Sequence, residues 1–254
     1  MLFAIDIGNT NIVLGVFNGD ELVGHWRLAT GTNRTADEFL LQVKALFDLR
    51  DIRLADIDGI ILATVVPTLI DPVVTMCERY FRQQPVIVGP GVKTGVAVEY
   101  EDPREVGADR VVNAVAAHLR YGGPCIVVDF GTATTLDAID ANGAYLGGAI
   151  APGISISSEA LFRHAARLPR VELLPPKVAI GRNTVSSMQS GIVYGYVGLV
   201  KELITRFRAE LSPDAKVIAT GGQAELIAPH TGMVDHIAPL LTLWGLKEIY
   251  RRNQ

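Results

Sequence analysis

Apolar residues in the first thirty positions come in short runs that are separated by glycine, asparagine and aspartate. The runs predict three β-strands, at Leu2–Gly8, Ile12–Phe17 and Leu22–Leu28. Asn18-Gly19, between the second and third runs, is a dipeptide typical of a tight hairpin turn. The chain is therefore expected to open with three strands, the last two joined by a hairpin.

Beyond these strands the apolar spacing becomes helical, and Thr35 with Glu38 has the pattern of a capping box at the helix start. The β-branched run Gly59–Val66 predicts a buried strand. The first half is completed by a helix from Pro67, a strand at Pro85–Val88, an irregular segment at Gly89–Arg104 and a helix at Gly107–Tyr121.

The second half repeats the pattern of the first. Cys125–Gly131, like Phe3–Gly8, is an apolar strand that ends in Asp-x-Gly, and Asn142-Gly143 then repeats the Asn-Gly turn of the first half. Further elements are expected as a helix after Gly153, a long helix at Thr184–Leu211, a strand at Lys216–Ala219 and a helix from about Leu240. The repeat predicts an α/β fold of two duplicated lobes, 1–122 and 123–254, around a central nucleotide cleft.

Composition and charge exclude several classes of protein. The 254 residues are 49% hydrophobic and 20% charged, as in an ordinary globular protein, which argues against disorder. A net charge of -4 without a long basic run argues against nucleic acid as the main partner. No apolar run reaches the length of a membrane helix, and no basic leader precedes one. Cys77 and Cys125, far apart in apolar surroundings, are expected to be reduced core thiols of a cytoplasmic protein.

The opening hairpin is a candidate phosphate clamp. Glycine lets the backbone approach a ligand, and the N–H groups and side chains of the turn can donate to phosphate oxygens. The six residues are Asp6, Ile7, Gly8, Asn9, Thr10 and Asn11. Asp6 is a candidate to hold a hydrated Mg²⁺. An ordinary Asx-type turn would show the same residues, but the recurrence of Asp-x-Gly at Asp129–Thr135 favours a pair of carboxylates for a cation–nucleotide complex.

Two further segments carry candidate chemistry. In Gly107-Ala108-Asp109-Arg110, Asp109 could accept a hydroxyl proton and Arg110 could bind an anion. Without context, a helix start with an acid favoured by the helix dipole and a solvated arginine explains this segment better. Thr220-Gly221-Gly222 follows a strand and could let a nucleoside lie against the backbone. Known hydrolase, metalloprotease and P-loop motifs do not occur in the sequence.

Taken together, six segments resemble the type III pantothenate kinases of the acetate kinase, sugar kinase, heat-shock ATPase and actin superfamily. They are Asp6–Asn11, Gly107–Arg110, Asp129–Thr135, Gly147–Gly153, Gly181–Thr184 and Thr220–Gly222. The resemblance implies actin-like, ribonuclease H-like lobes. It also implies ATP-dependent phosphorylation of the primary hydroxyl of pantothenate to 4'-phosphopantothenate, the first step of coenzyme A biosynthesis.

The same resemblance implies residue roles and partners. Asp109 is expected to be the general base, Thr132 an ATP contact, and Tyr100, Gly107, Ala108, Arg110 and Thr184 pantothenate contacts. Asp129 is expected to lie near a monovalent cation, K⁺ or NH₄⁺, with Mg²⁺ at the phosphates. A homodimer with the substrate site close to the subunit interface is also implied. Read without the family, Thr184 is equally well a helix cap.

Three alternatives remain open at this stage. The same scaffold could serve a regulatory or accessory factor without catalysis, or an actin-like or chaperone-like ATPase. A kinase acting on another small hydroxylated acid or sugar is the nearest enzymatic alternative, because one sequence does not reveal the shape of the acceptor pocket.

Overall fold

The computed structural model describes residues 1–31 and 33–254. Contacts divide the chain into two compact units. Unit 1 comprises Met1–Val96, Glu101–Ala116 and Thr242–Gln254, and unit 2 comprises Ala97–Tyr100 and Ala117–Leu241. The lobe boundary that the sequence predicts, between residues 122 and 123, stays a prediction.

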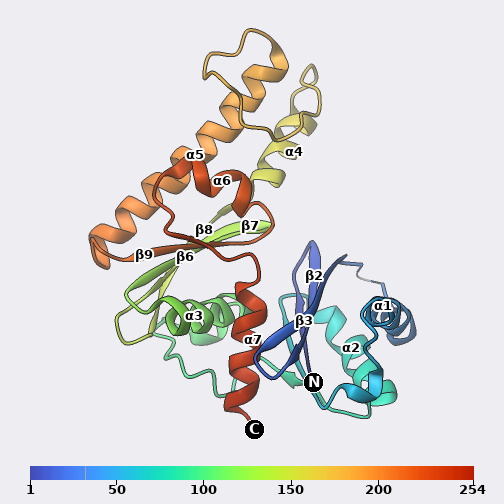
Figure 1. The fold of residues 1–254 in the computed structure, drawn as a ribbon. Helices are drawn as coiled ribbons and strands as arrows, with labels where there is room; N and C mark the ends of the chain where they lie inside the picture. The colour runs from blue at the N-terminus through green and yellow to red at the C-terminus, as the bar shows by residue number, and fades with distance from the viewer. Residues whose placement is uncertain (32) are drawn as a thin grey trace. The chain divides into compact units, whose positions relative to one another are not determined.

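Unit 1 is built on five strands, β1 (Leu2–Ile7), β2 (Asn11–Asn18), β3 (Glu21–Ala29), β4 (Gly59–Thr64) and β5 (Val86–Ile87). They form one mixed sheet in the order β3-β2-β1-β4-β5. Figure 1 shows its neighbouring strands β2 and β3. β1, β2 and β3 are antiparallel neighbours, whereas β1, β4 and β5 run parallel. The three opening strands and the buried strand of the first half are confirmed.

The helical segments of unit 1 are α1 (Ala36–Asp48), η1 (Leu54–Asp56), η2 (Pro67–Leu69), α2 (Ile70–Met76), η3 (Cys77–Phe81), η4 (Pro103–Glu105), the first part of α3 (Ala108–Tyr121) and all but the first residue of α7 (Leu241–Arg252). The capping box of Thr35 and Glu38 at α1 is confirmed. The helix expected from Pro67 is less regular than its sequence suggests. It begins as a 3-10 turn, continues as α2 and ends in the π-helical turn η3.

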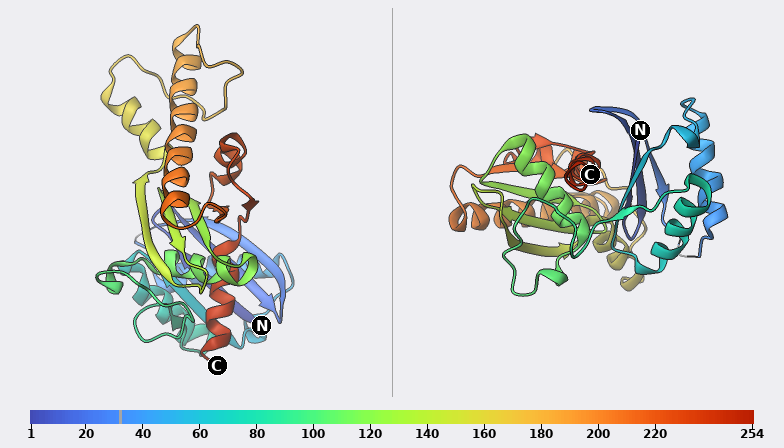
Figure 2. Two further views of the ribbon diagram at one scale, coloured as in Figure 1. Left: turned by 90° about the vertical axis from the view of Figure 1, so that its left-hand side faces the viewer. Right: turned by 90° about the horizontal axis from the view of Figure 1, so that it is seen from below.

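Helices pack on both faces of the unit 1 sheet (Figure 2). On one face, side chains of β1, β2 and β4 form a core with α1, α2 and η3, in which Phe3 and Phe47 meet edge to face with ring centroids 5.1 Å apart. On the other face Phe17 packs against Trp244 of α7, at 5.2 Å. A Cβ on Gly15 would lie 2.8 Å from a Leu243 methyl carbon, so this glycine permits α7 to approach β2 closely.

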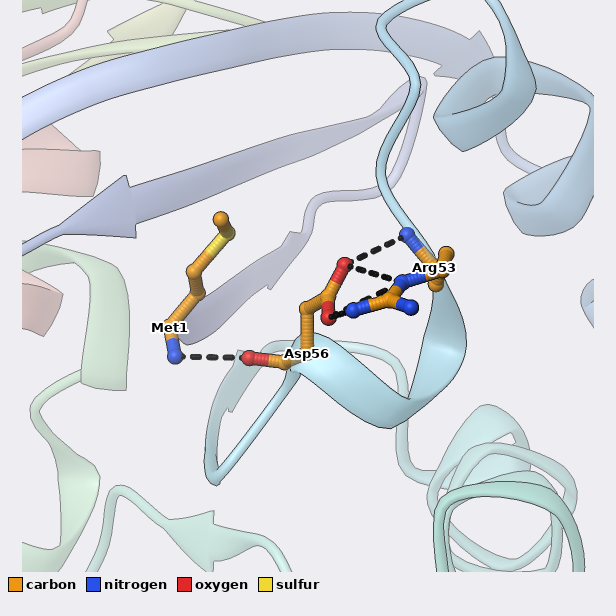
Figure 3. Close-up of polar contacts among 3 residues, drawn as sticks. All are labelled: Met1, Arg53 and Asp56. Carbon is orange, nitrogen blue, oxygen red and sulfur yellow. Dashed lines mark hydrogen bonds and ion pairs between the residues drawn. The ribbon is translucent and has the colours of Figure 1, made fainter.

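The start of β1 is tied to the turn that precedes β4 (Figure 3). The amino group of Met1 donates to the carbonyl oxygen of Asp56 at 2.7 Å, and the Arg53 guanidinium donates to the Asp56 carboxylate at 2.6 Å. β1 and β4 are parallel neighbours, with Ile7 opposite Thr64 at their carboxyl ends. These bonds therefore support the register that brings the two carboxyl ends to the same level.

Unit 2 repeats this topology. Its strands are β6 (Cys125–Phe130), β7 (Ala133–Ile139), β8 (Tyr145–Pro152), β9 (Lys216–Thr220) and β10 (His236–Ile237). The order β10-β9-β6-β7-β8 places β6 as β1 is placed in unit 1, with β7 antiparallel and β9 parallel to it. Asp6 and Asp129 each stand one residue before the end of the corresponding strand. The duplicated α/β fold is confirmed.

The helices of unit 2 are α4 (Ile154–His164), α5 (Thr184–Glu210), α6 (Ala224–Thr231) and the end of α3. α5 and α6 cover the core of β6 and β9. α4 and the first half of α5 project beyond the sheet of unit 2 (Figures 1 and 2). Within the described ranges no helix has an apolar stretch sufficient to cross a membrane.

The start of α5 differs from one reading of the sequence. Asn183, not Thr184, is the N-cap, because the Asn183 side chain accepts the N–H of Ser186 at 2.9 Å and Thr184 is already the first helical residue. The interpretation of Thr184 as the helix cap is therefore wrong. Its hydroxyl is not needed to start the helix, so another use for it stays open.

Candidate active site

The hairpin from Asp6 to Asn11 lies where β1 passes into β2, with Asn9 and Thr10 exposed at its tip. The N–H of Gly8 donates to the carbonyl oxygen of Asn11 across the turn at 3.0 Å. A Cβ on Gly8 would lie only 3.2 Å from that oxygen. The hairpin is thus a tight turn with a two-residue tip, a shape that presents backbone N–H groups to a ligand.

The segment Gly107–Arg110 opens α3, as predicted. The carbonyl oxygen of Gly107 accepts the N–H groups of Arg110 and Val111 at 3.1 and 3.3 Å. The Asp109 Oδ1 accepts the N–H of Arg110 at 2.8 Å. This bond fixes the orientation of the carboxylate at the positive end of the helix.

Burial dominates the electrostatics of Asp109. The pKa of Asp109 is raised above its usual value because the carboxylate is withdrawn from water, while the N–H and the positive charge of Arg110 act in the opposite direction. The Arg110 side chain is itself buried, with 8% of its surface exposed. A carboxylate with a raised pKa accepts a proton more readily than a solvated aspartate, as a general base must.

The start of α3 and the hairpin meet at one edge of the unit 1 sheet. The carbonyl oxygen of Ile7, at the end of β1, accepts the N–H of Val65, the residue directly after β4, at 3.1 Å. A Cβ on Gly107 would lie 3.6 Å from the Cγ1 of Val65. The structure therefore brings Gly107–Arg110 to the carboxyl ends of the parallel strands β1 and β4, where ligands bind in many α/β sheets.

In unit 2 the corresponding position belongs to Asp129. Asp129 pairs with Thr135 of β7 on one side and with Thr220 of β9 on the other. Gly221 has a φ of 90°, and a Cβ there would overlap both Oδ1 of Asp129 and the backbone of Phe130. The predicted strand-to-glycine passage is thus in direct contact with the carboxylate that was expected to bind a cation.

Thr132 lies in the turn after β6. Its carbonyl oxygen accepts the N–H of Gly153 at 3.1 Å, and a Cβ on Gly153 would overlap that oxygen. The Tyr196 hydroxyl of α5 bonds the hydroxyl of Thr134 and donates to the Pro152 carbonyl oxygen at 3.1 Å. Sequence reasoning missed Tyr196, because it reads as one more residue on the apolar face of a long helix.

Tyr100 belongs to the edge of the unit 2 sheet. The segment Ala97–Tyr100 runs along β8, where the N–H of Glu99 donates to the Tyr145 carbonyl oxygen at 2.8 Å. The Tyr145 ring is fully buried, lies 6.4 Å from the ring of Tyr100, and donates its hydroxyl to the buried Asp137 at 3.0 Å. Tyr100 remains 37% exposed and available to a ligand.

Thr184 lies apart from the other unit 2 candidates. It lines a pocket of about 740 Å³ together with Leu161, Arg182 and Met188. At 1.5 Å per helical residue, Thr184 is about 18 Å along α5 from Tyr196, the residue that contacts the ends of β7 and β8. The structure therefore does not bring Thr184 to the turn that holds Thr132 within unit 2.

The carboxylates suit a nucleotide-bound cation. Among the residues that the structure describes, no three His, Cys, Asp or Glu side chains gather into a metal-binding group. Mg²⁺ in phosphoryl transfer needs no such cage, since it binds through one or two carboxylates, water and the substrate phosphates. Asp6 at the hairpin fits that role, and Asp129 offers the oxygen ligand that hard cations prefer.

Comparison with known proteins extends these observations. Residues 2–206 match the family model described as type III pantothenate kinase. A type III pantothenate kinase from Moorella thermoacetica is 55% identical over 253 residues, covering all of both chains, and one from a Geobacillus species is 54% identical, covering all of this chain and 98% of its own.

Solved structures agree on the fold. A Campylobacter jejuni protein assigned to the Baf family of transcriptional activators has a TM-score of 0.62 at 22% identity, covering 99% of this chain and 98% of its own. The ethanolamine utilization protein EutJ from Carboxydothermus hydrogenoformans has a TM-score of 0.53 at 16% identity, covering 98% and 89%. At these identities the likeness concerns the actin-like fold alone.

The family match and the full-length relatives agree with the candidate site residues Asp6 and Asp129 at the ends of β1 and β6. This protein belongs to the type III pantothenate kinase family and is an ATP-dependent kinase of pantothenate.

Proposed function

We propose that Asp109 is the general base of the transfer. It takes the proton from the primary hydroxyl of pantothenate as the hydroxyl oxygen attacks the γ-phosphorus of ATP. The observation that carries this role is the burial of the Asp109 carboxylate, which raises its pKa, in an orientation that the Arg110 N–H fixes at the start of α3. Arg110 and the backbone of Gly107 and Ala108 would bind and orient the acceptor.

The phosphates of ATP are assigned to the hairpin and to Thr132. The N–H groups at the tip of the turn, with the Asn9 and Thr10 side chains, would donate to phosphate oxygens, and the hydroxyl of Thr132 would add a further contact. Asp6 would hold Mg²⁺ through water, and Asp129 would hold K⁺ or NH₄⁺. Bound cations neutralise charge on the phosphoryl oxygens. The nucleotide cleft between the lobes stays a prediction.

Tyr100 and Thr184 are proposed as pantothenate contacts that act in a homodimer. Thr184 is exposed at the start of α5, and large apolar side chains close to it in sequence are exposed as well. They include Leu174, Val178, Ile180 and Val185. Exposed apolar surface of this kind is typical of an interaction site. A second copy of the chain would cover it and bring Thr184 to a site on the partner.

Subunit mixing tests this arrangement. Asp109→Asn and Thr184→Trp are each expected to be inactive, and dimers reassorted from equal amounts would recover about a quarter of the wild-type sites if each site combines residues of two chains. The control is each variant mixed with itself. A mixture that stays inactive, although mixed dimers are present, refutes the shared site.

The acceptor is tested by direct phosphorylation. Wild-type protein with ATP and pantothenate is expected to release ADP and form 4'-phosphopantothenate. With short hydroxy acids or sugars in place of pantothenate, neither ADP nor a phosphorylated acceptor is expected. Release of ADP without phosphorylated pantothenate would contradict the proposed acceptor chemistry.

The buried, reduced thiols of Cys77 and Cys125 support a cytoplasmic location.

A further inference from the structure

We propose that Thr30 is a positioning residue of the nucleotide site. It orients the Gly8–Asn9 and Thr10–Asn11 peptide groups of the hairpin so that the N–H groups of Asn9 and Asn11 face the ATP phosphates. The inference rests on the proposed assignment of the phosphates to this hairpin. Thr30 was not among the residues that the sequence singled out.

Two hydrogen bonds connect Thr30 to the hairpin. Its hydroxyl donates to the carbonyl oxygen of Gly8 at 2.7 Å, and its N–H donates to the carbonyl oxygen of Thr10 at 2.9 Å. Thr30 directly follows β3, and β3 pairs with β2 up to Ala29 opposite Asn11. The sheet register therefore delivers Thr30 to the side of the turn.

Because peptide groups are planar, these two bonds also determine the direction of the N–H groups of Asn9 and Asn11. In a trans peptide the C=O and the following N–H point in opposite directions. When Thr30 binds the carbonyl oxygens of Gly8 and Thr10, the N–H groups of Asn9 and Asn11 must point away from Thr30. Both N–H groups are thus oriented before any ligand arrives.

The alternative orientation would harm anion binding. If either peptide group rotated, its carbonyl oxygen would replace an N–H on the side of the phosphates. The carbonyl oxygen and the phosphate oxygen would then repel each other. Without the Thr30 hydroxyl, the Gly8–Asn9 peptide loses a bond that opposes this rotation. Gly8 has no side chain to restrict the rotation itself, so the bond from Thr30 has a larger share in fixing it.

The test uses Thr30→Val, which removes the hydroxyl and keeps the N–H and the branched shape. One neutral hydrogen bond predicts a rise of about three- to tenfold in KM for ATP, while KM for pantothenate stays within about twofold. Thr30→Ser is expected to restore the wild-type KM for ATP. Thr205→Val is the matched control, because the Thr205 hydroxyl also donates to a backbone carbonyl oxygen at 2.8 Å, but on the exposed side of α5.

Each outcome decides between the explanations. An unchanged KM for ATP in Thr30→Val overturns the proposal. A rise of the same factor in KM for ATP and KM for pantothenate, together with a lower melting temperature, also overturns it, because that result would mark a purely structural role. Asp6→Asn separates this from a failure of the site itself. If Asp6→Asn leaves kcat and KM for ATP unchanged, the hairpin is not the phosphate site. If Asp6→Asn changes these constants and Thr30→Val does not, only the role of Thr30 is refuted.

Discussion

Replacing Asp109 by asparagine should separate catalysis from stability. The Asp109 Oδ1 accepts the Arg110 N–H at 2.8 Å, and the asparagine oxygen can keep that bond. The amide nitrogen then takes the place of the second carboxylate oxygen. A group that can only donate would stand where the base must accept a proton, so the acceptor hydroxyl is not activated.

The expected loss in kcat follows from general-base catalysis. Such a base contributes roughly 10²- to 10⁴-fold, or about 3 to 5 kcal/mol of transition-state stabilisation at 1.36 kcal/mol per factor of ten. KM for ATP should change little, since the hairpin Asp6–Asn11 is intact. In wild type, kcat/KM should fall as the pH drops through the raised pKa of Asp109, and this acidic limb should be absent from the residual activity of the variant.

The stability of Asp109→Asn should move in the other direction. The folded pKa of Asp109 is above its unfolded value, so its contribution to stability is fully present below the unfolded pKa and is lost as pH rises through the folded pKa. At neutral pH the ionised carboxylate disfavours folding. Asparagine removes that charge, and the variant should melt at the same temperature as wild type or higher.

A coupled ADP-release assay and thermal denaturation at pH 7 measure both effects. The control is Asp48→Asn, the same change in an exposed residue of α1 that pairs with Lys44 at 2.9 Å, where stability should change by less than about 0.5 kcal/mol. Wild-type kcat in Asp109→Asn would refute its role as base. A lower melting temperature would refute the electrostatic reasoning about its burial.

Three further predictions concern the neighbourhood of the site and the two cores. Gly221→Ala should remove most kinase activity in the same assay, because its methyl group would overlap the Asp129 carboxylate and φ is 90°; normal activity would contradict this packing. Phe47→Ala should lower the free energy of unfolding by about 3 to 5 kcal/mol in urea titrations, since Phe47 is fully buried among three aromatic rings. Cys77 should resist thiol reagents until the protein unfolds, because burial raises the pKa of its thiol to about 12; rapid labelling of folded protein at pH 8 would contradict this.

Local patterns made most of the fold predictable. Apolar runs and helical spacing depend on residues within a few positions of one another, so the strands around Asp6 and Asp129 and the helix that starts near Gly107 could be read directly. The repeat of Asp-x-Gly also predicted that both aspartates would stand at equivalent strand ends, as they do.

Features that depend on distant partners were not predictable in this way. Asp137 would be expected on the surface as a charged residue, yet it is fully buried, and the Tyr145 hydroxyl of the neighbouring strand β8 donates to its carboxylate. β10 has only two residues, and it exists because β9 offers a parallel partner. The bond from Thr30 to Gly8 spans 22 positions, and no periodicity reports such a pair.

The composition of unit 1 from three separate stretches of chain has a consequence for biosynthesis. α7 packs on the unit 1 sheet through Trp244 and Leu243, but the ribosome makes it only after all of unit 2. During translation the face of β2 that carries Phe17 must therefore wait uncovered while unit 2 emerges and folds. We expect nascent chains stalled before residue 241 to expose this apolar face to chaperones, and the kinase to reach its native state only after α7 leaves the exit tunnel.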